Sequence, residues 1–127
     1  MVDYYLEPDI FNHMVEQLNE KQLSNVLKAA SDPTRRSILT TLVQEGPTRV
    51  SDLAMHYDMS LNAVSKHIKV LEAAGLITRK TLGRVHLIEA NLAPVTEIDK
   101  WFKNLRSIWD LRLDNLEKLL SEEKKDD

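Results

Sequence analysis

The chain contains no cysteine, three glycines and four prolines among its 127 residues. Without cysteine it forms no disulfide, thiolate metal site or cysteine nucleophile, and this composition is typical of a reducing compartment. Three glycines are too few to suggest a glycine-rich loop of the kind that cradles phosphates. No apolar run approaches the roughly 18 residues that span a bilayer, and no secretion signal is recognisable. We therefore expect a cytoplasmic protein without membrane contact.

Catalytic constellations are missing as well. Serine, histidine and aspartate do not form a recognisable nucleophile–base pattern, and no paired carboxylates stand out. The composition, 43% apolar and 29% charged, is that of a globular protein. We expect one domain over residues 1–122, followed by a disordered tail at 123–127 that has no apolar residue. The sequence thus predicts a protein that is not an enzyme and needs no cofactor.

Charge is distributed unevenly along the chain. The net charge is −3, which by itself gives no reason to expect a nucleic-acid partner. Between Ser60 and Ile88, however, five cations accompany a single acid, so this segment carries +4 and the remainder −7. A basic segment on an acidic body is the electrostatic pattern of a nucleic-acid-binding surface.

Apolar residues at helical spacing predict about six helices. Their expected bounds are Glu7–Leu18, Lys21–Ser31, Pro33–Glu45, about Val50–Tyr57, Leu61–Ala74 and about Pro94–Leu120. Asp32 and Ser60 mark two of the starts, because aspartate and serine are good helix caps. Gly75 marks an end, because glycine readily adopts the left-handed conformation that follows a last turn. In the third helix the expected buried residues are Ile38, Leu39, Leu42 and Val43.

After Gly75 the apolar period changes from that of a helix to that of a strand. Residues 77–82 and 85–89 alternate as two short strands joined through Leu82-Gly83-Arg84, which predicts a β-hairpin. Two helices with a short turn between them, followed at once by a basic hairpin, predict a winged helix-turn-helix. The expected fold is mostly α with a small β-hairpin wing. Its parts are a helix-turn-helix at about 50–74, a wing at about 77–89 and a C-terminal helix at about 94–120.

The predicted helix from Leu61 to Ala74 has two different faces. Val64, Ile68 and Leu71 share the face that must pack on the body of the domain. The opposite face suits DNA, because asparagine can pair with adenine, lysine reaches guanine or phosphate, and alanine permits close approach. Cations on the hairpin suit the adjacent DNA backbone or minor groove. The candidate DNA-binding residues are Asn62, Ala63, Ser65, Lys66, Lys69, Arg79, Lys80 and Arg84.

Four motifs occur in order along the chain and resemble those of a known family. They are Asp32-Pro33-Thr34-Arg35-Arg36 with Ile38-Leu39, Ser51-Asp52-Leu53-Ala54, Ser65-Lys66-His67-Ile68-Lys69-Val70-Leu71, and Ala74-Gly75-Leu76-Ile77. Over roughly residues 20 to 113 the sequence is similar to the ArsR family of bacterial transcriptional repressors. The resemblance implies a homodimer that dimerises through its first and last helices and binds an inverted-repeat operator in double-stranded DNA. In many members an effector, often a metal ion, weakens DNA binding.

The sequence departs from that family at its metal sites. Metal-sensing members often carry Glu-Leu-Cys-x-Cys-Asp-Leu at the first helix of the motif, whereas this chain has Pro47-Thr48-Arg49-Val50-Ser51-Asp52-Leu53. A second family site uses aspartate and histidine on the last helix, which here has no histidine. The four histidines of the chain show no helical ligand spacing. We therefore expect a regulator that binds DNA independently of metal.

The last predicted helix carries more apolar surface than a short domain needs. Trp101, Phe102 and Trp109 lie within nine residues, and the heptad-like spacing is typical of a helix–helix interface. Burial in the core is the simpler alternative, but we favour a dimer interface. A third alternative is a pocket beneath these aromatics that binds an unknown small-molecule effector. The candidate dimer residues are Ile10, Met14, Ile98, Phe102, Leu105, Trp109, Leu113 and Leu116.

Other positions also have competing interpretations. His67 can contact phosphate or pack at the flank of its helix, and we favour packing. For Arg35 and Arg36, pairing with acids near a helix start is preferred to DNA contact. The main alternative function is a winged-helix module that dimerises and binds a protein without reading DNA. Its weakness is the cationic face around Lys66 and Lys69, which such a module does not need. A MarR-like regulator fits less well, because that family usually has longer wings and a different helix order.

Overall fold

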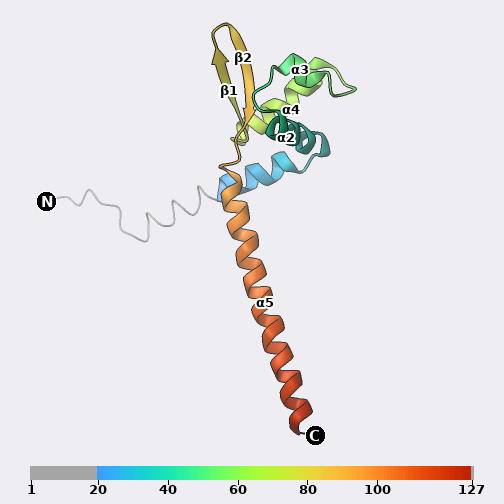
Figure 1. Ribbon diagram of the computed structural model, residues 1–127, viewed down its shortest axis with the longest axis vertical. Coiled ribbons are helices and arrows are strands. Elements are labelled where there is room, and N and C mark those ends of the chain that lie inside the picture. The colour runs from blue at the N-terminus through green and yellow to red at the C-terminus, as the bar shows by residue number, and fades with distance from the viewer. Residues whose placement is uncertain (1–19, 127) are drawn as a thin grey trace, which may run out of the picture. The chain divides into compact units, whose positions relative to one another are not determined.

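The computed structural model describes residues 20–126, which hold five helices and one two-stranded hairpin (Figure 1). The chain divides into two units, with the boundary between Val95 and Thr96, and each is described by itself. The first contains helical residues 20–30, α2 (Pro33–Glu45), α3 (Val50–Ala54), α4 (Leu61–Ala73), β1 (Ile77–Leu82) and β2 (Val85–Ala90). The expected helix from Glu7 to Leu18, with Ile10 and Met14, lies outside the described residues.

Within the first unit, the helix bounds agree with the sequence to within a residue, except at the end of α3. This helix stops at Ala54, three residues before the predicted Tyr57. The N–H groups of Met55, His56 and Tyr57 instead bond carbonyls three residues back, at 3.1 to 3.3 Å. The chain therefore tightens into turns that lead to the start of α4, rather than continuing as an α-helix.

Both predicted caps are present. The Asp32 carboxylate accepts a hydrogen bond from the backbone N–H of Arg35 at 3.0 Å. The Ser60 hydroxyl accepts one from the N–H of Ala63 at 3.1 Å. Each bond satisfies one of the N–H groups that the first turn of a helix leaves without a partner. These caps fix where α2 and α4 begin.

The wing is a regular antiparallel hairpin whose strands pair from Ile77 opposite Ala90 to Leu82 opposite Val85. Its two-residue turn has Gly83 at φ 62°, the position at which a type II′ turn needs glycine. Near the base of the hairpin, the Asn91 side chain donates to the carbonyl of Gly75 at 3.0 Å. The wing is thus held in place immediately after α4.

The core of the first unit is apolar and draws on every element. It consists of Val26, Ala29, Ile38, Leu42, Leu53, Val64, Ile68, Leu71, Ala74, Leu76, Ile77 and Ile88. Leu39 is half-buried, but Val43 is 52% exposed, so the expectation that Val43 is buried is wrong. One residue beyond Leu42, it lies about 100° around α2 and points away from the buried face.

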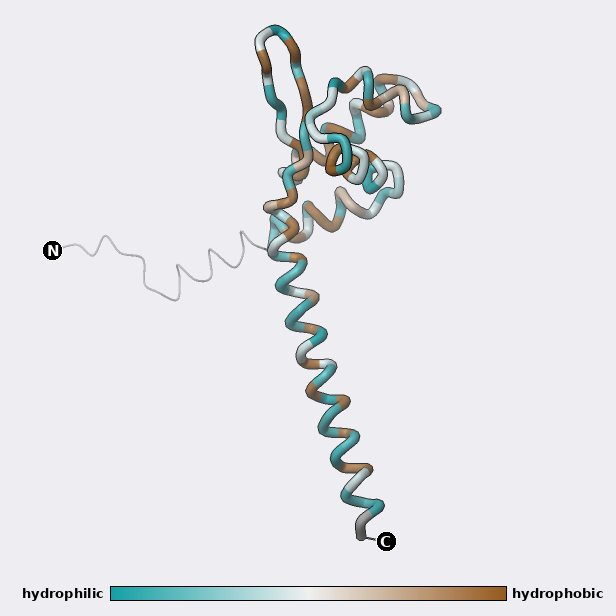
Figure 2. Tube along the Cα trace, in the orientation of Figure 1, coloured by the Kyte–Doolittle hydropathy of each residue, from teal (hydrophilic) through white to brown (hydrophobic). Residues whose placement is uncertain are grey.

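The helix α5 begins at Val95 and ends at Asp126, and its residues from Thr96 onward belong to the second unit (Figure 1). It continues through residues 123–126 and thereby corrects the expected disordered tail at 123–127 over that stretch. Glutamate and lysine are good helix formers, so these residues need no apolar contact to remain helical. Figure 2 shows apolar residues recurring along α5 between hydrophilic ones. The expected single domain over 1–122 stays a prediction.

None of the helices in the described range is long and apolar enough to cross a bilayer.

Candidate nucleic-acid interface

The helix α4 is anchored by one face and exposes the other. Val64, Ile68 and Leu71 are buried, and α4 packs against α2, α3 and β1. Asn62, Lys66 and Lys69 follow one another at intervals of four and three residues, which places them on a common outward face. Among the predicted contacts on α4, Asn62, Lys66 and Lys69 are exposed, and Ala63 and Ser65 are half-buried.

The wing cations differ in their surroundings. Arg79 and Lys80 are neighbours on β1 and therefore point to opposite faces of the hairpin. The Arg79 Nε donates to the Glu72 Oε2 at 2.7 Å, which joins the wing to α4. Lys80 lies on the other face and Arg84 lies in the turn; both are exposed and neither forms an ion pair among residues 20–126. Of the three predicted wing contacts, Arg79 alone is paired with an acid within residues 20–126.

Arg35 and Arg36 have a structural role that the sequence did not predict. The Nε and Nη2 of Arg35 donate to the carbonyls of Ala29 at 2.7 Å and Lys28 at 3.1 Å. Arg36 Nη1 donates to the carbonyl of Ala30 at 2.7 Å. These carbonyls lie at the end of helical residues 20–30, where helices leave acceptors unpaired. The partners are therefore backbone carbonyls, in place of the acids that we expected.

His67 packs at the flank of α4, as the sequence analysis favoured. Its side chain is 24% exposed, and its Nδ1 lies 3.9 Å from Asp32 Oδ2 and 3.5 Å from Arg35 Nη1. The hydrogen bond from the Arg35 N–H holds the pKa of Asp32 below its ordinary value, aided by the charges of Arg35 and His67 and opposed by desolvation. Side-chain contacts in this cluster link the start of α2 to the middle of α4.

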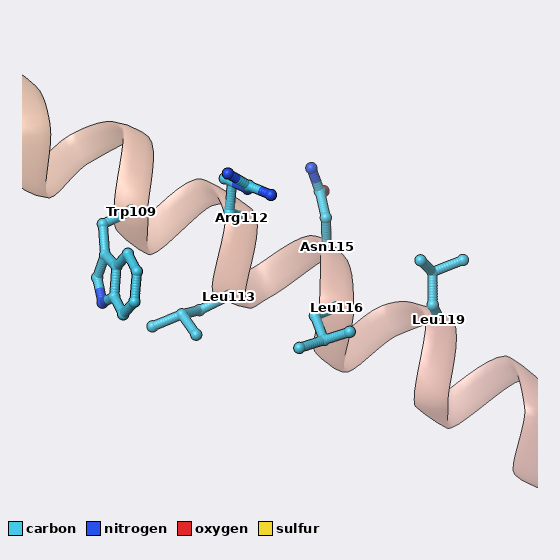
Figure 3. A pocket seen from close by; sticks show the side chains of 6 residues that line it. All are labelled: Trp109, Arg112, Leu113, Asn115, Leu116 and Leu119. Atoms are coloured by element: carbon cyan, nitrogen blue, oxygen red, sulfur yellow. The ribbon is translucent and has the colours of Figure 1, made fainter.

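The predicted dimer residues of α5 present a continuous apolar stripe. Ile98 is half-buried, whereas Phe102 and Trp109 are 54% and 64% exposed, and Leu105, Leu113 and Leu116 are exposed as well. In Figure 3, Trp109, Leu113 and Leu116 project to one side of the helix and Arg112 and Asn115 to the other. A groove of about 490 Å³ runs between these two rows. Within residues 96–126, nothing covers this stripe.

Metal ligands do not gather within the described part of the chain. No group of three histidine, aspartate or glutamate side chains there is placed to hold a metal ion. His13 lies outside this range. Arg49, the cap residue of α3, and Ser51 within α3 occupy the two cysteine positions of the metal-site motif.

A polar helix face held outward by a buried one, next to a basic hairpin, defines a winged helix-turn-helix DNA-binding domain. Comparisons with known proteins agree. The family model described as a helix-turn-helix domain matches residues 30–80. Transcriptional repressor SdpR of Bacillus subtilis (strain 168) is 33% identical over 82 residues, which cover 65% of this chain and 90% of that protein.

Solved structures lead to the same family. The crystal structure of an ArsR family transcriptional regulator aligns with a TM-score of 0.65 at 36% identity, covering 72% of this chain and 93% of that one. A homodimeric winged helix-turn-helix DNA-binding domain from Mycobacterium bovis aligns with a TM-score of 0.55 at 22% identity, covering 79% and 89%, and shows the fold alone. This chain belongs to the ArsR family of DNA-binding transcriptional regulators. The family comprises regulators, not enzymes.

Proposed function

We propose that this protein is a homodimeric repressor that reads an inverted-repeat operator with α4 and the wing, independently of metal. The observation that carries the proposal is the division of α4 into two faces. Val64, Ile68 and Leu71 fix the helix in the core, so Asn62 and Lys66 are held outward in a defined orientation. A rigid helix with such an outward face suits insertion into the major groove of B-DNA.

The contacts on this surface divide into two kinds. Asn62, Ser65 and Lys66 lie toward the start of α4, the part of a recognition helix that contacts base edges. Asn62 can bond the N6 and N7 of adenine together, and Lys66 reaches guanine or phosphate. Lys80 and Arg84 on the wing neutralise backbone phosphates, which adds affinity without sequence information. Ala63 lets the helix approach closely, and Lys69 supports the backbone contacts.

Dimerisation follows from the apolar stripe of α5. Phe102, Leu105 and Trp109 are exposed in the single chain, and large contiguous apolar surfaces mark protein interfaces. A second copy that covers the stripe places two α4 helices about a two-fold axis, and an inverted-repeat operator mirrors that symmetry. The homodimeric state of the solved relative from Mycobacterium bovis supports this assembly. Ile10 and Met14 belong to the same proposed interface.

Metal independence is proposed from the ligand types. Arg49 and Ser51 replace the thiolates of metal-sensing relatives, and α5 has no histidine in its described residues. A cation at the first position repels a metal ion instead of binding it. Any effector is then a molecule other than a metal.

Selection of bound sequences from a random DNA pool tests the proposed function. We expect enrichment of a two-fold symmetric sequence, bound equally with zinc or with a chelator. Recovery of no common sequence would favour the alternative, a winged-helix module that binds a protein partner. Under this alternative, we expect the affinity for DNA to be weak and the same for all duplexes.

A further inference from the structure

A groove of about 370 Å³ lies between the start of α3 and the wing turn. It is lined by Arg49, Val50, Ser51, Arg84, Val85 and His86. Two arginines and a histidine therefore meet here from segments more than thirty residues apart in the chain. Of these residues, only Arg84 was predicted from the sequence to contact DNA.

Backbone pairing builds this groove. Thr48 pairs with Ile88 of β2 in antiparallel fashion, and each N–H donates to the other's carbonyl at 2.9 Å. The Thr48 hydroxyl also donates to the carbonyl of Gly46 at 2.8 Å. Because the pairing is antiparallel, the chain after Thr48 continues beside β2 toward the wing turn (Figure 1). Arg49 is thereby held against the wing.

The lining of the groove is rich in hydrogen-bond donors. No carboxylate lines it, and Arg49 and Arg84 form no ion pair among residues 20–126. Arg49 precedes α3 as its cap residue, but its side chain makes no capping bond. Asp52, in the first turn of α3, is the acid nearest to Arg49 along the chain, and it does not line the groove. This environment suits an anion and offers no carboxylate to a cation.

We propose that the groove binds a phosphate group, and that its occupant is a phosphodiester of the DNA backbone beside the segment read by α4. The guanidinium fork matches phosphate oxygens, which accept two parallel N–H bonds. Arg84 belongs both to this groove and to the proposed DNA face. A duplex that contacts Arg84 on the wing therefore also lies against the groove. The inference rests on the proposed function and adds Arg49, Ser51 and His86 to the interface. Free phosphate is the other source of the same chemistry.

The salt dependence of DNA affinity tests whether the groove binds a phosphodiester of DNA. In Arg49→Ala we expect affinity for operator and scrambled duplexes to fall by the same factor. The log–log salt slope should become shallower by about 0.9 per subunit, hence by about 1.8 for a dimer. Arg49→Lys should keep most of the slope, because a lysine still neutralises the phosphate. Lys21→Ala removes an exposed cation from helical residues 20–30 and should leave the slope unchanged.

The thermal midpoint of the protein without DNA, in inorganic phosphate and in chloride at equal ionic strength, tests the other source. A phosphate-specific rise that Arg49→Ala abolishes, with an unchanged DNA salt slope, supports the groove with free phosphate as its ligand. If the parent protein prefers no DNA sequence, the proposed function fails. The thermal midpoint in phosphate still shows whether the groove binds a phosphate group. The inference is overturned if Arg49→Ala matches the parent in both the salt slope and the response to phosphate.

Discussion

The Arg79 Nε lies 2.7 Å from the Glu72 Oε2, so the wing and α4 are joined by an ion pair. Both side chains remain partly exposed, and such pairs contribute little to stability, about 0–1 kcal/mol. The ion pair should matter more for DNA binding than for stability, because it changes the charge that Arg79 can offer to a phosphate. A guanidinium already paired with a carboxylate has less charge available for a phosphate than Lys80, which lies on the opposite face of the hairpin and has no ion-pair partner within residues 20–126.

We therefore predict different salt dependences for two adjacent cations. Lys80→Ala should make the log–log salt slope shallower by about 0.9 per subunit, whereas Arg79→Ala should change it much less. Glu72→Gln should release Arg79 and strengthen binding to every duplex alike. Fluorescence anisotropy at several salt concentrations measures all three. Equal slopes for the Arg79 and Lys80 variants would show that the ion pair opens in the complex.

Dimerisation should depend on the apolar stripe of α5. Phe102→Ala and Trp109→Ala should each destabilise the dimer by about 3–5 kcal/mol if the rings are fully buried in it. Sedimentation at micromolar concentration should then show monomer for the variants and dimer for the parent. Lys118→Ala, which does not belong to the stripe, is the matched control. A stable monomeric parent protein would rule out this assembly.

Arg35 should matter to stability rather than to DNA contact. Arg35→Ala removes two side-chain hydrogen bonds to the carbonyls of Ala29 and Lys28, and bonds from charged donors contribute about 1.5–3 kcal/mol. Arg35→Lys should rescue little, because a lysine cannot reproduce the fork. Denaturant unfolding should show a lower free energy of unfolding for Arg35→Ala and Arg35→Lys. The decrease should be smaller for Arg36→Ala, which loses a single hydrogen bond. An unchanged unfolding midpoint in Arg35→Ala would contradict this role.

Acid should weaken the start of α2. The pKa of Asp32 is lowered in the folded chain, chiefly by the N–H of Arg35, so the unfolded chain binds its proton at higher pH. The stabilisation is therefore complete above the ordinary aspartate pKa of about 4 and is lost as pH falls through the lower folded value. Asp32→Asn keeps the cap without the charge and should unfold with a weaker pH dependence below about pH 4. Identical acid profiles for variant and parent would exclude a contribution from Asp32.

Much of the fold could be predicted from the sequence because its signals are local. Caps, glycine positions and the change of apolar period located α2, α4 and both strands to within a residue or two. The early end of α3 could not be predicted, because Met55 to Tyr57 carry no breaker, and the exposure of Val43 depends on which way α2 faces. The continuation of α5 to Asp126 depends on helix propensity and not on burial. It could not be predicted from the spacing of apolar residues, because residues 123–126 include none.

The candidate site was harder to predict where it depends on tertiary pairing. The outward face of α4 follows from periodicity alone, so the exposure of Asn62 and Lys66 could be predicted. The pairing of Arg79 with Glu72, and the meeting of Arg49 with the wing through Thr48 and Ile88, join segments distant in sequence. No local pattern signals either contact. The Arg35 bonds could have been suspected, because a cation beyond a helix end often binds its last carbonyls.

The central claim is that α4 reads bases, and Asn62→Ala tests it most directly. Binding isotherms on the selected operator and on a scrambled duplex should show a loss of about 1–3 kcal/mol on the operator only. Lys80→Ala, measured alongside, should weaken both duplexes by the same factor. If Asn62→Ala binds both duplexes as the parent does, or weakens both equally, Asn62 does not read a base, and the proposed recognition by α4 is contradicted.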